Sequence, residues 1–314
     1  MSALPEAVVL FGASGFIGRN ILARLVGTIP AVYGVTHSGV EVPGCAIVVA
    51  ANAVRDLPPL PADTIAINAA AYRYNAATFR AEQTAIFDAN VRIANVVLGF
   101  AAERDISEIR LASSSAVYPA EWTLLDDERP IDLNAPPHSD EALYAWSKRW
   151  AEIASDLHHQ SSGINTLTFR LTNPYGPFDS TDPAAAHVVA AFVMRALLSS
   201  DLFEIRGNPN AERDFIFAGD VAETFLASLS HRGLHDAFNL GFGETISVRD
   251  LATVAVRVGG KSQPIVVVGE MTEGALVRRA TVTKLRRSFD LPPFRSLDRG
   301  LAVTFDWYRD ALQR

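Results

Sequence analysis

The fold is decided close to the amino terminus, by the stretch AVVLFGASGFIG at residues 7–18. Residues 7–11 are a short, uninterrupted apolar run, which is typical of a strand covered on both faces in a parallel sheet. Three glycines follow at GxxGxxG spacing, and apolar residues then recur at helical spacing from residue 16 to residue 26. A glycine-rich turn between a strand and a helix is the context in which a dinucleotide-binding fingerprint is meaningful.

Each of these glycines has a physical reason. Gly12 makes the sharp turn off the strand. Gly15 lets the backbone approach a pyrophosphate, whose charge is met by the helix N-terminus. Gly18 lets the helix pack closely against the sheet. We therefore expect a bound dinucleotide that contacts the three glycines and the residues between them, Ser14, Phe16 and Ile17.

The remaining first half alternates between strands and helices. Strand-like runs at 31–35, 46–50, 64–68 and 106–112 are separated by helical patterns, the longest from about 78 to 104. This alternation predicts an α/β fold with a Rossmann-type, doubly wound parallel sheet.

The second half has a more mixed pattern. A proline-rich stretch at 121–139 predicts a surface loop that leads to a helix near Leu143, and a further helix is expected near 184–199. We expect a smaller C-terminal α/β lobe that binds the substrate. The expected division places residues 1–172 and about 214–240 in the Rossmann domain, and residues 173–213 and 241–314 in the substrate lobe.

Composition restricts the class of protein. Of 314 residues, 49% are hydrophobic, and 28 basic against 35 acidic side chains give a net charge of −7. Such a chain can build a core, but it offers no basic stripe for nucleic acid. Cys45 is the only cysteine, so it can form neither an intramolecular disulfide nor a cysteine-based zinc site, and we expect no metal. Without a recognisable signal peptide or membrane-length apolar run, we expect a cytoplasmic protein that does not associate with membranes.

The choice of cofactor is read at the end of the second strand, where an acid would hold the ribose hydroxyls of NAD. Residues 34–38 contain no acid. Thr36 would not repel a 2′-phosphate, and His37 or Arg19 could meet its charge. The sequence therefore favours NADP over NAD, although a threonine can also hydrogen-bond a ribose.

A candidate acid/base pair stands on a predicted helix. Tyr144 and Lys148 are four residues apart and share one face, so both side chains can reach a reacting hydroxyl or carbonyl. A lysine cation and the positive ring of an oxidised nicotinamide both favour the phenolate. Lowering the tyrosine pKa by about 3 units, roughly 4 kcal/mol, would bring it into a useful range. Upstream, the serines at 113–115 follow a strand at the sheet's carboxyl edge, where a hydroxyl can contact a substrate oxygen.

Together, these motifs resemble those of the extended short-chain dehydrogenase/reductase superfamily, in its nucleotide-sugar epimerase, dehydratase and reductase branch. They occur in the family's order, as GASGFIG, SSSAVYP, YAWSK, RLTNPYGP, RDFIFAGDVA and FNLGFGE. The resemblance spans essentially the whole chain. It implies hydride transfer at a sugar carbon of a nucleotide-diphosphate sugar, with Tyr144 as acid/base and Ser114 and Lys148 as its catalytic partners.

The resemblance also assigns binding residues. It implies cofactor contacts from Asn52, Ala70, Tyr144, Lys148 and Pro174, in addition to the residues above. It implies substrate contacts from Ser115, Asn173, His187, Arg213 and Arg279, with Arg278 as the alternative to Arg279 for a second phosphate contact. A homodimer through the helices at 78–104 and 142–162 is implied as well.

Departures from the family pattern narrow the chemistry. The 4,6-dehydratases carry an Asp-Glu pair just after the catalytic hydroxyl, where this chain has Ser115 and Ala116. Residues 173–179 are similar to the GDP-fucose synthase-type 4-keto sugar reductases, and His187 falls on their histidine acid. Their cysteine, however, is replaced by Ala116, which cannot exchange protons at a ring carbon. Simple 4-keto reduction is therefore favoured over 3,5-epimerisation.

Four functions stay open at this point. The first is reduction of a 4-keto sugar by NADPH, and the second is 4-epimerisation with a tightly held NAD. A non-catalytic dinucleotide sensor is the third, although such proteins usually lack the Tyr or the Lys of the pair. The fourth is an enzyme of the same fold on a non-sugar alcohol, which Asn173 and Arg213 argue against because only a diphosphate needs such partners.

Overall fold

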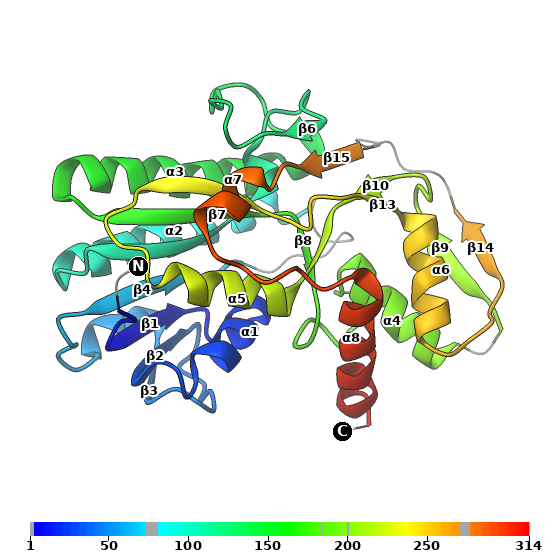
Figure 1. The fold of residues 1–314 in the computed structure, drawn as a ribbon, viewed down its shortest axis with the longest axis horizontal. Helices are drawn as coiled ribbons and strands as arrows, with labels where there is room; N and C mark the ends of the chain where they lie inside the picture. Colours follow the sequence, from blue (N-terminus) through cyan, green and yellow to red (C-terminus); the bar gives the residue numbers. More distant parts are fainter. Residues whose placement is uncertain (1–2, 73–80, 184, 200, 270–276, 314) are drawn as a thin grey trace.

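The structure is a computed structural model, and it describes residues 3–72, 81–183, 185–199, 201–269 and 277–313. Its central element is a seven-stranded sheet in the order β12-β7-β5-β4-β1-β2-β3, with every pair parallel (Figure 1). The strands are β1 (Ala7–Phe11), β2 (Ala31–Thr36), β3 (Ile47–Ala50), β4 (Thr64–Asn68), β5 (Glu108–Ser114), β7 (Asn165–Leu171) and β12 (Asp236–Leu240). The chain runs outward from β1 to β3 and then returns to β4 on the other side of β1. This reversal is the switch point of a Rossmann sheet, so the predicted fold class is confirmed.

Helices cover both faces of this sheet. α1 (Phe16–Leu25) and α5 (Ala218–Ser228) pack on one face, and α2 (Gln83–Glu103) and α3 (Ala142–Ser162) pack on the other (Figure 1). The apolar run of β1 packs against the helices on both faces of the sheet, because successive side chains point to opposite faces. Val8 and Leu10 join the cluster that contains α1 and α5 side chains, whereas Val9 and Phe11 join the cluster that contains α2 and α3 side chains.

The smaller lobe follows the carboxyl ends of the central strands (Figure 1). It contains helices α4, α6 and α8, whose Phe192, Leu251 and Phe305 share an apolar cluster. Its helices are α4 (Val188–Leu198), α6 (Val248–Val258) and α8 (Leu297–Ala311), with α7 (Thr283–Ser288) leading to α8. Its strand pairs are β8 (Asn173–Tyr175) with β11 (Phe215–Phe217), and β9 (Phe203–Arg206) with β14 (Ile265–Val268). The domain boundaries expected from the sequence stay a prediction.

A second sheet has four strands, in the order β13-β10-β15-β6. Its strands are β6 (Leu124–Leu125), β10 (Glu212–Arg213), β13 (Ile246–Ser247) and β15 (Val277–Ala280). β6 comes from the stretch at 121–139 that the sequence predicts as a surface loop. Two paired residues are too few to leave a periodic pattern, so this strand could not be predicted. Short 3-10 turns complete the chain at η1 (Ala51–Asp56), η2 (Ser115–Val117) and η3 (Ser139–Glu141).

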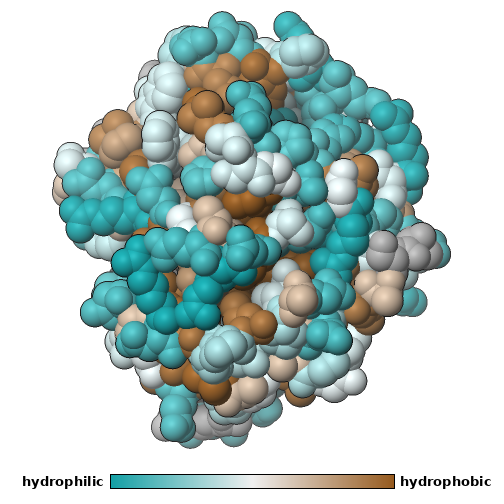
Figure 2. Space-filling view, turned by 90° about the vertical axis from the view of Figure 1, so that its left-hand side faces the viewer, coloured by the Kyte–Doolittle hydropathy of each residue, from teal (hydrophilic) through white to brown (hydrophobic). Residues whose placement is uncertain are grey.

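α2 is apolar enough, by length and composition, to cross a membrane, with a mean hydropathy of 1.4 in its most apolar window. The sequence pattern predicted no such stretch, and the predicted start of this helix near residue 78 lies outside the described residues. In the fold α2 packs on α3 and the sheet, and Val97, Phe100 and Ala101 are buried. These contacts are those of a core helix, and a single helix of this kind is weak evidence for a membrane span. Figure 2 views the end of the molecule opposite the smaller lobe, where hydrophilic residues surround several apolar areas.

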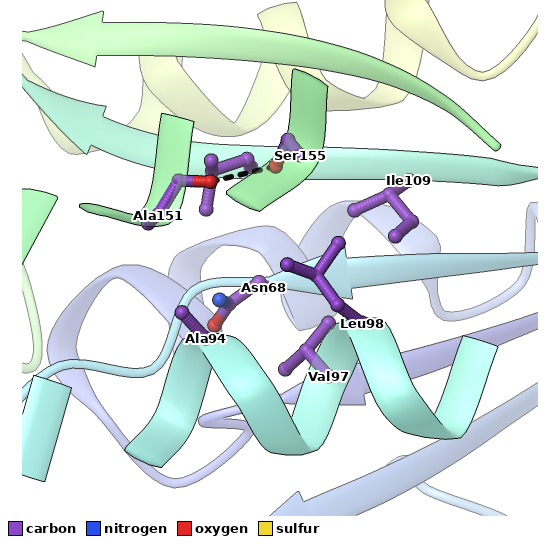
Figure 3. Close-up of a pocket in the computed structure, with 8 residues that line it drawn as sticks. Asn68, Ala94, Val97, Leu98, Ile109, Ala151 and Ser155 are labelled. Carbon is purple, nitrogen blue, oxygen red and sulfur yellow. Dashed lines mark hydrogen bonds between the residues drawn. The ribbon is translucent and has the colours of Figure 1, made fainter. Parts of the chain in front are cut away.

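A small cavity lies between α2, α3, β4 and β5 (Figure 3). Its lining residues are Asn68, Ala94, Val97, Leu98, Ile109, Leu111, Ala151 and Ser155. A volume of about 10 Å³ leaves room for about one water. The cavity is therefore a packing feature behind the sheet edge, too small for a dinucleotide or a sugar.

Candidate active site

The glycine-rich turn after β1 forms a cradle at the switch point. Gly12 has φ +81°, and a Cβ added to it would lie 2.7 Å from the backbone of Ala70, after β4. A Cβ on Gly18 would overlap the carbonyl oxygen of Gly12. Gly15 caps α1 without any side-chain hydrogen bond to the first amides of the helix. The first turn of α1 therefore offers backbone N–H groups to an anion, as the sequence predicts.

The residues between these glycines differ in exposure. Ser14 is exposed and Phe16 is buried, while Ile17 is partly buried and packs against the core. Beyond them, Arg19 lies with its guanidinium carbon 4.1 Å from the centre of the Phe178 ring. This cation–π contact ties α1 to the loop after β8, so Arg19 has a partner other than the phosphate it was expected to meet.

The end of β2 presents a threonine that is already engaged. Thr36 is buried, and its hydroxyl accepts a hydrogen bond of 2.9 Å from the backbone N–H of Gly39. His37 and Asn52 are both exposed, on the loops that follow β2 and β3. The contacts of Thr36, His37 and Asn52 with a dinucleotide stay a prediction.

Three predicted catalytic residues meet at the carboxyl edge of the sheet. Ser114 ends β5, and Tyr144 and Lys148 lie one turn apart on α3. Tyr144 shares a hydrogen bond with the Ser114 side chain. Lys148 Nζ lies 5.8 Å from the centre of the Tyr144 ring and donates a 3.1 Å hydrogen bond to the carbonyl of Ala112. The serine and the phenol are therefore hydrogen-bonded to each other with an ammonium near the phenol ring, an arrangement that suits acid/base chemistry.

Burial sets the titration of this trio. Burial raises the pKa of Tyr144 to about 12, the Ser114 hydrogen bond lowers it, and the nearby Glu141 carboxylate raises it. Burial lowers the pKa of Lys148 to about 8, against the attraction of Glu152. In the protein alone, desolvation of the phenolate dominates, so the pKa of Tyr144 is raised and the phenol is protonated near neutral pH. The lowering expected from the sequence includes the charge of an oxidised nicotinamide, and it stays a prediction.

A buried ion pair lies behind Lys148. Glu152, one turn further along α3, accepts a 2.7 Å hydrogen bond from Arg170 on β7 and a 2.6 Å hydrogen bond from Ser113. Arg170 also donates to the Tyr118 hydroxyl at 3.3 Å. The sequence motifs do not predict this network, although the spacing of four residues from Lys148 to Glu152 indicates a shared helix face.

Asn173 and Pro174 are held at the junction of the two lobes. The Asn173 side chain and backbone amide both donate to the carbonyl of Asp214, at 2.9 and 3.1 Å. The Asp214 carboxylate is fully buried and accepts from the backbone N–H groups of Phe242 and Gly243. Burial raises the pKa of Asp214 to about 6, and these hydrogen bonds oppose the increase. Asp214 thus fixes the loop after β12 next to β8.

The predicted histidine acid stands at the start of α4. His187 Nδ1 lies 3.1 Å from Asp179 Oδ2, and 54% of the His187 side chain is exposed. Asp179 is buried, so the pair orients the imidazole from the loop after β8.

Two arginines lie side by side where the sequence predicts phosphate contacts. Arg213 on β10 is in register with Arg278 on β15. Arg278 donates to Glu141 at 2.7 Å and to the carbonyl of Ser115 at 3.1 Å. Arg279, assigned as the phosphate contact, is exposed. Neighbouring residues of a strand point to opposite faces, so Arg278 lies on the same face as Arg213 and Arg279 lies on the other. This placement favours Arg278 as the second phosphate contact, and both assignments stay predictions.

These residues form a glycine-rich cradle, a Ser–Tyr–Lys trio and an arginine pair around one edge of the sheet. A family model described as the NAD dependent epimerase/dehydratase family matches residues 8–241. The chain belongs to this family. The resemblance inferred from its motifs is thereby confirmed, and the chain is an enzyme of this family.

Several proteins that are similar to this chain are named as sugar-nucleotide reductases, synthases or epimerases. A dTDP-4-dehydro-6-deoxy-D-allose reductase from a Streptomyces species is 28% identical over 234 residues, which cover 74% of this chain and 71% of the relative. A GDP-L-fucose synthase from Dictyostelium discoideum is 25% identical over 232 residues, 71% of each chain. Among solved structures, a UDP-glucose 4-epimerase from Thermotoga maritima with UDP-glucose has a TM-score of 0.80 at 20% identity, covering 98% of this chain and 99% of that one.

Proposed function

We propose that this enzyme reduces the 4-keto group of a nucleotide-diphosphate-linked sugar, with NADPH as the hydride donor and Tyr144 as the proton donor. The observation that carries the proposal is that the hydrogen-bonded Ser114–Tyr144 pair lies next to the Arg213–Arg278 pair. Arg278 contacts the carbonyl of Ser115, the residue next to Ser114. This contact supports one sugar nucleotide that reaches both the trio and the arginine pair.

The cradle after β1 fits a dinucleotide. The space that a Cβ on Gly12 or Gly18 would fill, and the first turn of α1, suit a pyrophosphate next to Ala70. The absence of an acid at residues 36–38 supports NADP, with the exposed His37 facing a 2′-phosphate and Thr36 and Asn52 toward the adenosine half. Pro174 would flank the nicotinamide. When bound, the reduced cofactor supplies a hydride to the carbonyl carbon.

The chain's own groups handle the proton. Tyr144, with a pKa of about 12, is protonated near neutral pH and can donate its proton to the carbonyl oxygen as negative charge develops there. The Ser114 hydroxyl donates a hydrogen bond to the same oxygen. The Lys148 cation stabilises the phenolate that remains. Asn173 and His187 would orient the sugar, and Arg213 with Arg278 would bind the diphosphate.

Two observations favour reduction over the other reactions of the family. The curated relative with 28% identity is named as a 4-dehydro sugar reductase. Ser115 and Ala116 follow Ser114 and contain no carboxylic acid that could expel water in a dehydration.

The test measures NADPH and NADH consumption with dTDP-, GDP- and UDP-linked 4-keto-6-deoxy sugars. We expect turnover with NADPH in preference to NADH. Tyr144→Phe should lower kcat at least about 100-fold and leave the Kd for NADPH close to that of the wild type. Near-normal turnover of Tyr144→Phe would contradict the mechanism. A protein that retains stoichiometric NAD through purification and consumes no NADPH would be a 4-epimerase instead.

We also propose a homodimer that buries α2 and α3. Both helices carry exposed apolar side chains, with Val96 at 38%, Trp150 at 38% and Leu157 at 53% exposure. Trp150 and Asn95 join the two helices through a 3.0 Å hydrogen bond, which supports one continuous face. Burying such a face in a second copy would remove apolar surface from water.

A further inference from the structure

Glu141 lies where the 3-10 turn η3 meets the start of α3. Its carboxylate makes no hydrogen bond to the first amides of that helix. Here it reaches across to Arg278 on β15, with an N–O distance of 2.7 Å.

The arginines that it meets form an anion site. Arg213 and Arg278 are in register on adjacent strands, so two like charges face the same side of the sheet. Burial and the Arg278 charge lower the pKa of Arg213, and Glu141 raises it. Only 12% of the Arg278 side chain is exposed, against 38% of Glu141. The Glu141 carboxylate therefore sits as the anionic partner of a largely desolvated cation.

We propose that Glu141 is an internal competitor for the diphosphate of the substrate, and that it holds Arg278 until a phosphoryl group displaces it. The inference rests on the proposed function, because it takes Arg213 and Arg278 as the diphosphate site. A carboxylate and a phosphoryl group use the same guanidinium donors, so both cannot make the full set of hydrogen bonds to Arg278 at once. The displaced carboxylate is partly exposed and can turn to solvent at little cost.

Competition has a measurable consequence for specificity. The ligand must replace an existing ion pair and approach a negative charge, so its affinity is lower than the two arginines alone would give. A ligand with two phosphoryl groups can engage Arg213 and Arg278 together, whereas a monophosphate can satisfy Arg213 and leave the Glu141–Arg278 pair intact. Glu141 therefore affects binding of the diphosphate more than binding of the monophosphate.

The test is calorimetric titration with dTDP, UDP and GDP and with the matching monophosphates. Glu141→Gln should bind the preferred nucleoside diphosphate about two- to tenfold more tightly than the wild type, the range expected for loss of a partly exposed ion pair. Its affinity for the monophosphate should change less. The control is Glu128→Gln, which removes an equal charge from an exposed pair with Arg287 and should leave both affinities unchanged.

The outcomes separate this inference from the proposed function. If the wild type binds a nucleoside diphosphate and Arg213→Gln weakens that binding, the diphosphate site stands. Unchanged or weaker diphosphate binding by Glu141→Gln would then overturn the competitor role alone. If no nucleoside diphosphate binds the wild type, the proposed substrate class fails. A general loss of structure cannot produce tighter binding, so a gain in affinity reports the competition itself.

Discussion

At the scale of single residues, burial in the candidate acid/base site disfavours the charged forms of its side chains. Lys148 is buried with its pKa lowered to about 8, and its ammonium has Glu152 as the acid that supports its charge. Keeping such a group charged in the folded protein costs free energy of folding. The proposed catalytic site therefore carries a local loss of stability.

We therefore predict that Lys148→Met makes the protein more stable, by an amount that depends on pH. The lysine titrates near 10.5 when unfolded and near 8 when folded, so below pH 8 the full penalty applies. Between these values the unfolded chain binds more protons, and wild-type stability rises with pH. Lys148→Met should be more stable than the wild type by about 2–3 kcal/mol at pH 7 and by less than half of that at about pH 9.5. Urea unfolding at both pH values measures the difference, and kcat should be lost.

The matched control for this substitution is Lys261→Met, on an exposed turn. Its stability should differ from that of the wild type by the same small amount at both pH values. A stability gain of Lys148→Met that does not change with pH would mean that the lysine charge is not its cause.

At the scale of elements, the packing of α1 on β1 determines whether the cofactor cradle exists. The helix approaches the strand so closely that Gly18 lies against the carbonyl of Gly12. A side chain there would move the first turn of α1, whose amides face the expected pyrophosphate. The geometry of the cradle is thus a property of the strand–helix pair rather than of any one residue.

Gly18→Ala should therefore weaken NADPH binding at least about tenfold and destabilise the protein by about 1–3 kcal/mol, because the new Cβ cannot fit. Isothermal titration and chemical unfolding measure the two effects. Gly99→Ala is the control, since a Cβ on this α2 residue meets no atom within 4 Å. It should keep cofactor affinity and gain about 0.5–1 kcal/mol of stability from helix propensity. Equal behaviour of the two variants would contradict the close approach at Gly18.

At the scale of the whole molecule, buried polar contacts join segments that are distant in the sequence. Asn20 of α1 donates a 2.9 Å hydrogen bond to the carbonyl of Pro177, beyond β8. Tyr118 donates a 2.8 Å hydrogen bond to Asn239, whose side chain in turn reaches the carbonyls of Leu125 and Thr281. Buried polar networks of this kind fix one relative arrangement of the layers when every member has a partner.

The prediction for the homodimer concerns the outer face of α2 and α3. If two copies associate there, Leu157→Glu should place a charge in the interface and raise the dimer dissociation constant at least about tenfold. Sedimentation equilibrium measures that constant. Leu198→Glu is the control, because Leu198 is 65% exposed on α4 in the smaller lobe. A wild type that is monomeric at micromolar concentration would overturn the proposed dimer.

The sequence alone determined the features that depend on neighbours along the chain. The run of β1, the glycine turn and the start of α1 follow from a few consecutive residues, and Tyr144 and Lys148 share a face because the helix repeat places them there. The order of alternating strands and helices was sufficient to predict the parallel sheet. The ordered motifs were sufficient to identify the family.

Tertiary structure alone decided the features that depend on distant segments. Arg278 rather than Arg279 lies on the same face as Arg213, because the register of β15 against β10 sets the direction of each side chain. Glu141 meets an arginine 137 positions away, and no local pattern announces that pair. The pKa of Tyr144 is raised by its partial burial in the folded chain. Burial and long-range pairing arise only when the chain is folded, so the sequence could name the reacting groups but not their electrostatic surroundings.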